Sequence, residues 1–467
     1  MVFSSLFFLY LFLPLCVILY AANKNISYKN AVLLIFSLFF YAWGEPVYVF
    51  ILIMSAAVNF SFGLMIERYK GGAGAKVATA SAVIFDIAML GVFKYSAFIV
   101  DNINNIAGTS LNVPDISLPI GISFFTFQMI SYIIDCQWEK IEVQSSFPKF
   151  LMYVSLFPQL VAGPIVRYST IEAEINSRKT TSEDLYAGIT RLAFGLGKKV
   201  IISNNLSTVV SGIFDGQLSE LSVLGTWLGA VLYALQIYFD FSGYSDMAIG
   251  IGRIFGFNFD ENFNYPFICK DVSEFWQRWH ISLSTFFRDY LLYVPIFGKR
   301  RKYGGLFLVW FCTGLWHGAS WNYVIWGLYF GLFIFLEIKI GKKKMKKIPL
   351  VVRHIYNKIV IIIGFGIFYF EDFDRLGQFF RNLIGLDGNP VINEFTKLSV
   401  TNNLYLILAA VICSFPIAKL IRKKAEKSTA LSGIVEFVKI PVNIGLIIIS
   451  SIMLVDATNN PFLYFRF

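Results

Sequence analysis

Charge is scarce in this sequence, and its scarcity excludes an ordinary soluble fold. Only 15% of the 467 residues are Asp, Glu, Lys or Arg, while 56% are hydrophobic. Soluble domains are usually about 25% charged and about 45–50% apolar. Aromatic residues reach 18%, with 49 phenylalanines, which is more than a single soluble core holds. The composition therefore predicts a protein whose solvent is largely the lipid bilayer.

Cysteine and histidine are also rare, and familiar catalytic motifs are missing. The five cysteines lie far apart, so they predict neither a metal-ligand pair nor a disulfide framework. The sequence has no Gly-x-Ser-x-Gly turn and no phosphate-binding P-loop, and Gly250-x-Gly252 follows no predicted strand. A Ser/His/Asp hydrolase is unsupported, and we expect no metal site and no permanently bound cofactor.

What the sequence does contain is a series of long apolar runs. A helix that crosses a bilayer needs about 20 mostly apolar residues. We predict an all-α, polytopic membrane protein with ten to twelve crossings, and one domain over residues 1–467, because no repeat or linker divides the chain. The first run lacks a basic flank and is expected to be retained. The candidate spans are 3–20, 30–44, 46–67, 77–100, 118–135, 147–163, 222–250, 303–320, 322–340, 355–370, 402–420 and 436–456.

The basic residues set the orientation. The net charge is +10, and its Lys and Arg cluster between apolar runs, at 68–76, 299–302, 342–347 and 422–427. Clusters of this kind remain in the cytoplasm and suit anionic lipid head groups. We therefore expect membrane lipids, and no nucleic acid, as partners of this charge. Residues 101–117 and 371–401 are then expected to face outward.

Two stretches of mixed polarity do not read as simple spans. They are residues 164–221 and 257–300. Polar or irregular backbone survives at membrane depth only inside protein or beside water. We expect both stretches to form re-entrant or amphipathic segments of an inner layer around a site.

His317 is the first candidate for chemistry. It lies in an apolar span, where an ionisable residue is costly and is by default a functional hypothesis. Gly314 and Gly318 flank it and leave space for a substrate or for a second backbone. Close helix packing around a structural histidine is the alternative interpretation.

His280 is the second candidate, in an aromatic segment that includes Trp276 and Trp279. An interfacial anchor is the simpler interpretation of this stripe. The polar company of Arg278 and Arg288 favours a functional role, at a vestibule on the cytoplasmic side.

His354 stands beside a basic cluster and is expected to be a simple interfacial residue. Two carboxylates, Asp240 and Asp246, lie within another apolar run. Buried acids usually pair with a cation, and Arg253 and Arg278 are candidate partners.

At these residues the chain resembles the membrane-bound O-acyltransferase family, nearly end to end and closest to its alginate O-acetylation branch. The segments that carry the resemblance are LPIGISFFTFQ at 118–128, FPQLVAGPIVR at 157–167, FWQRWH at 275–280, FRDY at 287–290, WHGASW at 316–321 and NPFLYFRF at 460–467. The resemblance implies a helical membrane bundle with a central tunnel. It also implies acyl transfer from a thioester to a hydroxyl or amine, with His317 as the essential catalytic residue and His280 as the second family histidine.

The implied reaction is transfer of an acyl group, expected to be acetyl, to a cell-surface polysaccharide of a bacterium. The donor is expected to be acetyl-CoA or another cytoplasmic thioester, whose phosphates Arg278 and Arg288 attract unless they are only orientation signals. The protein is expected in the inner or plasma membrane of a bacterium, with a secreted SGNH-type acetyltransferase as a possible relay partner outside the cytoplasm. D-alanyl transfer to teichoic acid remains open, as does a transporter or channel without chemistry.

Overall fold

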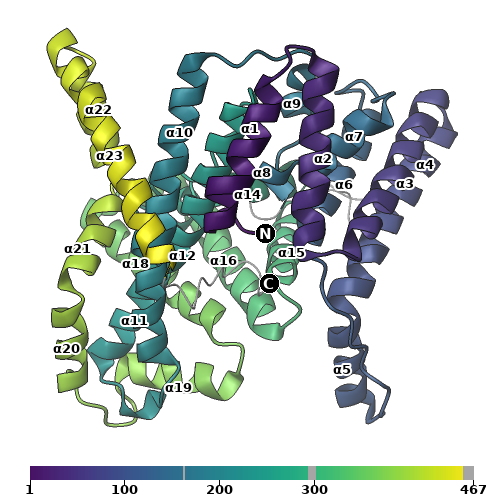
Figure 1. Ribbon diagram of the computed structural model, residues 1–467. Coiled ribbons are helices and arrows are strands. Elements are labelled where there is room, and N and C mark those ends of the chain that lie inside the picture. The colour runs from purple at the N-terminus through teal and green to yellow at the C-terminus, as the bar shows by residue number, and fades with distance from the viewer. Residues whose placement is uncertain (161–162, 293–300, 456–467) are drawn as a thin grey trace. The chain divides into compact units, whose positions relative to one another are not determined.

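The computed structural model describes residues 1–160, 163–292 and 301–455. Every regular element within these ranges is a helix, as Figure 1 shows. The chain forms two compact units, one from residues 1–192 and 245–261 and the other from residues 193–244 and 262–467. That they act as one domain stays a prediction. The cluster residues Lys299 and Arg300 and the terminal motif at 460–467 lie outside the described residues.

The first unit is a bundle of helices with buried polar side chains among its apolar core residues. One polar contact joins two spans, where the Asn59 side chain donates a 2.8 Å hydrogen bond to the buried Asp86 carboxylate. The helices that begin in this unit are η1 (Phe8–Phe12), α1 (Leu13–Ala21), α2 (Ile26–Gly44), α3 (Tyr48–Arg68), α4 (Ala73–Leu90), η2 (Gly91–Tyr95), α5 (Ser96–Ala107), α6 (Ile122–Gln137), α7 (Phe147–Ser155), α8 (Phe157–Leu160), α9 (Tyr168–Asn176) and α10 (Ser182–Gly197).

The second unit holds all three histidines. Its helices are η3 (Lys198–Ser203), α11 (Asn204–Phe214), η4 (Leu218–Glu220), η5 (Pro266–Ile268), α13 (Val272–Trp276), α14 (Ile281–Tyr290), α15 (Lys302–His317), α16 (Trp321–Ile340), α17 (Lys342–Met345), α18 (Leu350–Tyr369), α19 (Phe373–Ile384), α20 (Glu394–Asn402), α21 (Leu404–Cys413), α22 (Ile417–Ala425) and α23 (Thr429–Val455). Helix α12 (Val223–Ile254) begins here and ends in the first unit.

The membrane character of the chain is confirmed, whereas the number of crossings stays a prediction. Among the described residues, seven helices are long and apolar enough to cross a bilayer, or up to eight if α20 and α21 form one broken span. The predicted spans at 118–135 and 303–320 are helices of 16 residues. At 1.5 Å per residue, each is about 24 Å long, which is shorter than a hydrocarbon layer of about 30 Å. The described part of the predicted span at 147–163 contains two short helices, α7 of nine residues and α8 of four.

Helices α15 and α16 form a tight hairpin, and glycines are the reason. A Cβ on Gly314 would lie 2.3 Å from the Tyr323 carbonyl oxygen, and one on Gly327 would lie 2.2 Å from the Trp310 carbonyl oxygen. A Cβ on Gly318 would meet the Tyr323 ring at 2.3 Å. The idea that Gly314 and Gly318 leave space for a substrate is therefore wrong. They let two helices approach closely, which was the alternative interpretation.

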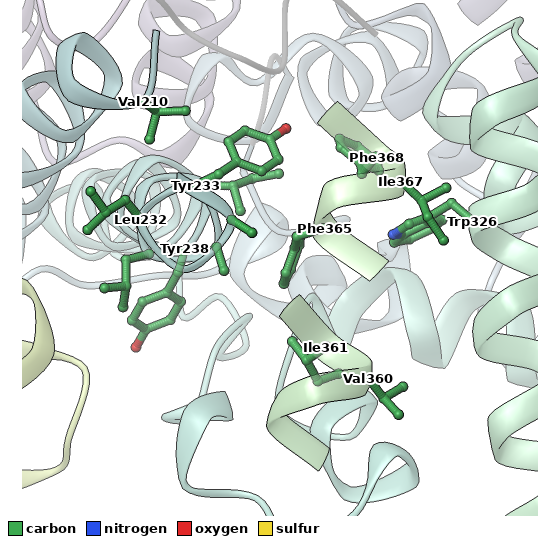
Figure 2. Close-up of a cluster of buried hydrophobic side chains, with 14 of the residues drawn as sticks. Val210, Leu232, Tyr233, Tyr238, Trp326, Val360, Ile361, Phe365, Ile367 and Phe368 are labelled. Carbon is green, nitrogen blue, oxygen red and sulfur yellow. The ribbon is translucent and has the colours of Figure 1, made fainter. Parts of the chain in front are cut away.

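Helix α18 completes the core of the second unit. Figure 2 shows Phe365 on the side of α18 that faces α12, while Ile367 lies beside Trp326 of α16. The ring centroids of Phe365 and Tyr233 are 6.5 Å apart, and those of Trp326 and Phe368 are 5.2 Å apart. One apolar cluster thus joins α12, α16 and α18.

Candidate active site: two histidines in an aromatic cluster

Residues 271–292, which belong to the predicted re-entrant segment, fold back on themselves against α15 and α16. At its base, the Glu337 carboxylate accepts hydrogen bonds from the backbone of Val272 and Ser273, at 2.7 and 2.8 Å. Glu337 lies in the last turn of α16, next to the basic cluster of α17. Asp271 anchors the same base through a 2.8 Å ion pair with Arg353 of α18.

From this base the segment runs along the α15–α16 hairpin, turns at His280 and runs back along α15. The Trp276 ring packs against Trp310 at 4.9 Å, and the His280 ring lies 5.6 Å from Trp316. On the return, Leu292 lies against Gly305. Gly305 and Trp316 are eleven residues apart on α15, so the tip at His280 stands about 16 Å along α15 from Gly305.

His280 occupies the turn between the two limbs of this segment. Its φ of +45° is in the left-handed region, which non-glycine residues adopt rarely and often at functional sites. The side chain is 1% exposed. The Phe241 ring of α12 meets the imidazole edge-on, with ring centroids 4.5 Å apart. His280 is therefore buried in protein, and its position at a vestibule on the cytoplasmic side stays a prediction.

His317 is the last residue of α15, and its ring is enclosed by aromatic side chains. The centroids of Trp316, Trp326 and Phe368 lie 4.9, 4.8 and 5.1 Å from that of the imidazole, all nearly perpendicular to it. His317 is 6% exposed and lies about 22 Å along α15 from Lys302. His317 is thus buried inside the protein, and its depth in the membrane stays a prediction.

The tip of the re-entrant segment brings the two histidines into one site. Trp316 contacts both imidazole rings, and the charge of His317 acts on His280. Burial lowers the pKa of His280 well below its ordinary value of about 6.5, because the imidazolium ion loses its hydration. Repulsion from His317 lowers this pKa further. Burial and this repulsion both favour the neutral imidazole, which can accept a proton.

The two candidate phosphate-binding arginines have carboxylate neighbours. Arg278 forms a 2.9 Å ion pair with Glu274 and donates a 3.2 Å hydrogen bond to the Asn264 carbonyl oxygen. Arg288 is mostly exposed and lies 2.8 Å from Asp289. A phosphate that binds either guanidinium must therefore displace the neighbouring carboxylate or share the guanidinium with it.

The acidic residues of α12 are paired, as expected, but with other cations than those predicted. Asp240 forms a buried ion pair with Lys199 of η3. Asp246 lies 2.8 Å from Arg191. The predicted partner Arg253 instead contacts Asp184 at 3.0 Å. The packing of α12 against the segment that carries Lys199 decides that Lys199 pairs with Asp240. The two residues are far apart in the sequence, so this pairing could not be predicted from their spacing.

One polar contact of the site escaped the sequence analysis. The Asn262 side-chain oxygen lies 3.2 Å from Nδ1 of His280, and Asn262 is completely buried. The sequence gives only a weak indication of this contact. Asn262 and Asn264 flank Phe263 in an asparagine-rich stretch that precedes the aromatic segment.

Comparison with known proteins points to one family. The model of the family described as MBOAT, membrane-bound O-acyltransferase, matches residues 137–372, which include His280 and His317. The chain is 37% identical to the probable alginate O-acetylase AlgI of Pseudomonas aeruginosa, over 89% of this chain and 81% of that protein. It is 31% identical to the peptidoglycan O-acetyltransferase of Helicobacter pylori, over 83% of this chain and 80% of that protein. It is 32% identical to the teichoic acid D-alanyltransferase of Bacillus subtilis, over 45% of this chain and 56% of that protein.

Proposed function

Because this chain belongs to the membrane-bound O-acyltransferase family, we propose that it moves an acetyl group from a cytoplasmic thioester to hydroxyl groups of a cell-surface polysaccharide. The observation that carries the proposal is the pair of buried histidines joined by Trp316. Two of the three histidines in the chain meet at one place, inside the part that matches the family. A polysaccharide acceptor agrees with the names of the relatives that the chain matches over most of its length.

The chemistry asks little of the protein beyond position and proton transfer. In the proposed step, the acceptor oxygen forms a bond to the thioester carbonyl carbon while His317 takes the hydroxyl proton. The carbon–sulfur bond then breaks, and the proton passes from His317 to the departing thiolate. No metal and no permanently bound cofactor is needed, because the thioester is already activated.

The geometry supports a route for the donor from the basic side. The re-entrant segment has its base beside the Lys-rich end of α16, and its tip carries His280 to the site. We assign the binding of the donor phosphates to Arg278 and Arg288 of this segment. Acetyl-CoA is the simplest donor of this class. The basic clusters favour a base on the cytoplasmic side of the inner or plasma membrane.

A comparison of strains tests the proposal. O-linked acetate and D-alanine esters are measured on purified surface polymers from a strain that lacks this chain and from the complemented strain. We expect acetate to fall in the deletion strain and to return on complementation, while D-alanine stays constant. A loss of D-alanine instead would assign the chain to teichoic acid. Unchanged esters of both kinds would favour a transporter without chemistry.

A further deletion strain tests whether the acetyl group passes through a secreted partner. Transfer to the polysaccharide by way of a secreted SGNH-type acetyltransferase predicts that deletion of such a partner also removes the acetate, while the membrane protein persists. Acetylation that continues without the partner would indicate direct transfer.

A further inference from the structure

Two donor groups and a ring nitrogen converge on one oxygen beside His280. The Asn262 Oδ1 atom lies 3.2 Å from the backbone nitrogen of Ser282, 2.9 Å from its hydroxyl oxygen and 3.2 Å from Nδ1 of His280. Asn262 is 0% exposed. The same atom therefore contacts both the imidazole and the first turn of α14.

This convergence determines which end of the Asn262 amide faces the histidine. A backbone N–H group can only donate, so the atom that receives the Ser282 N–H must be the amide oxygen. An oxygen at 3.2 Å from Nδ1 is repelled by a nitrogen lone pair and attracted by an N–H group. Nδ1 of His280 therefore carries the hydrogen. In the neutral ring, Nε2 then holds the lone pair.

The backbone of Asn262 supports the same turn. Its carbonyl oxygen accepts a 3.0 Å hydrogen bond from the Ile281 nitrogen, and the nitrogen of Asn264 donates a 2.9 Å bond to the Arg278 carbonyl oxygen. The segment 262–264 thus lies along the residues on both sides of His280. It holds that residue in its left-handed conformation, with φ of +45°.

We infer that Asn262 is a positioning residue, which fixes His280 in the tautomer that has hydrogen on Nδ1 and directs the basic Nε2 into the reaction site. The inference rests on the proposed function for its purpose, but the tautomer itself is a property of the resting protein. A carboxylate or amide oxygen behind an imidazole is a common way to fix which nitrogen acts as the base.

The tautomer is tested without any assay of activity. The chain has three histidines, so 15N-histidine labelling gives three ring systems, and loss of one set in a His280→Gln variant assigns the signal. We expect the wild-type ring of His280 to be protonated on Nδ1, and Asn262→Leu to abolish this preference. A wild-type ring protonated on Nε2 would overturn the inference, whatever the enzyme transfers.

A double-mutant cycle tests the consequence for catalysis. We expect Asn262→Leu to lower polysaccharide acetylation by about 10–100-fold, a size usual for removal of such a supporting partner. In a His280→Ala background the same change should have no further effect. Asn262→Asp keeps an acceptor oxygen and should retain more activity than Asn262→Leu. A loss of equal size with and without His280 would overturn the positioning role.

Controls separate this inference from the wider proposal. Asn258→Leu removes another loop asparagine, which bonds to Glu174 and not to the site, and is the matched control for damage to folding. If His280→Ala leaves acetylation intact, the assigned role of His280 fails while the tautomer measurement still stands. If the labelled ring shows the expected tautomer but no polymer is acetylated, the proposed function fails alone.

Discussion

Replacement of His317 by asparagine removes the proposed general base and keeps a polar side chain. Asparagine can donate and accept hydrogen bonds, but it cannot take a proton near neutral pH. His317 lies at the end of α15, 6% exposed and ringed by Trp316, Trp326 and Phe368.

The expected loss of activity follows from the role. General acid–base catalysis contributes about 10²–10⁴-fold in rate, which corresponds to about 2.7–5.5 kcal/mol of transition-state stabilisation. The substitution also removes three ring contacts, and ring pairs of this kind contribute about 0.5–1.5 kcal/mol each. We therefore expect acetylation to fall at least 10²-fold, together with a smaller loss of protein stability.

The assay compares O-linked acetate per polymer mass at equal membrane abundance of the protein. His354→Asn is the matched control, because His354 lies in α18 at the edge of the basic cluster and contacts neither site histidine in the described structure. We expect this control to acetylate normally. Normal acetylation by His317→Asn at normal abundance would refute the reasoning and leave His317 with a packing role only.

Three further predictions concern packing, pairing and donor binding. Gly314→Ala should lower the membrane abundance of the protein, because the added Cβ would lie 2.3 Å from a carbonyl oxygen. Gly433→Ala is the control and should not lower it, because nothing lies within 4 Å of that Cβ. Equal abundance of the two variants would contradict the packing role of Gly314. Lys199→Met should destabilise the protein by about 3–5 kcal/mol by leaving Asp240 buried without its cation, and a second change of Asp240 to leucine should recover much of that stability in thermal denaturation. Arg288→Gln should raise the KM for a phosphate-bearing thioester and leave the KM for a short thioester without phosphates unchanged; equal effects on both donors would reduce Arg288 to an orientation signal.

Features set by local composition were predictable from the sequence. The apolar run predicted at 322–340 is helix α16 (Trp321–Ile340), and the run at 222–250 begins α12 (Val223–Ile254). Length and hydropathy are sufficient there because a bilayer selects long apolar helices. The runs at 118–135 and 147–163 were less well predicted. Their helices are short and largely buried in protein, and apolar composition does not distinguish a protein core from lipid.

The buried position of His317 and the aromatic segment around His280 followed from sequence alone, since an apolar run and an aromatic stripe are local patterns. Only the tertiary structure decided that the two rings share Trp316 as a neighbour, 36 residues after His280. It also decided that Asn262 faces His280, that Lys199 pairs with Asp240, and that the glycines beside His317 serve helix contact. These facts depend on which surfaces meet when helices pack and when a segment folds back on itself. Sequence spacing fixes the face of a helix on which a residue lies, but packing chooses the partner opposite that face.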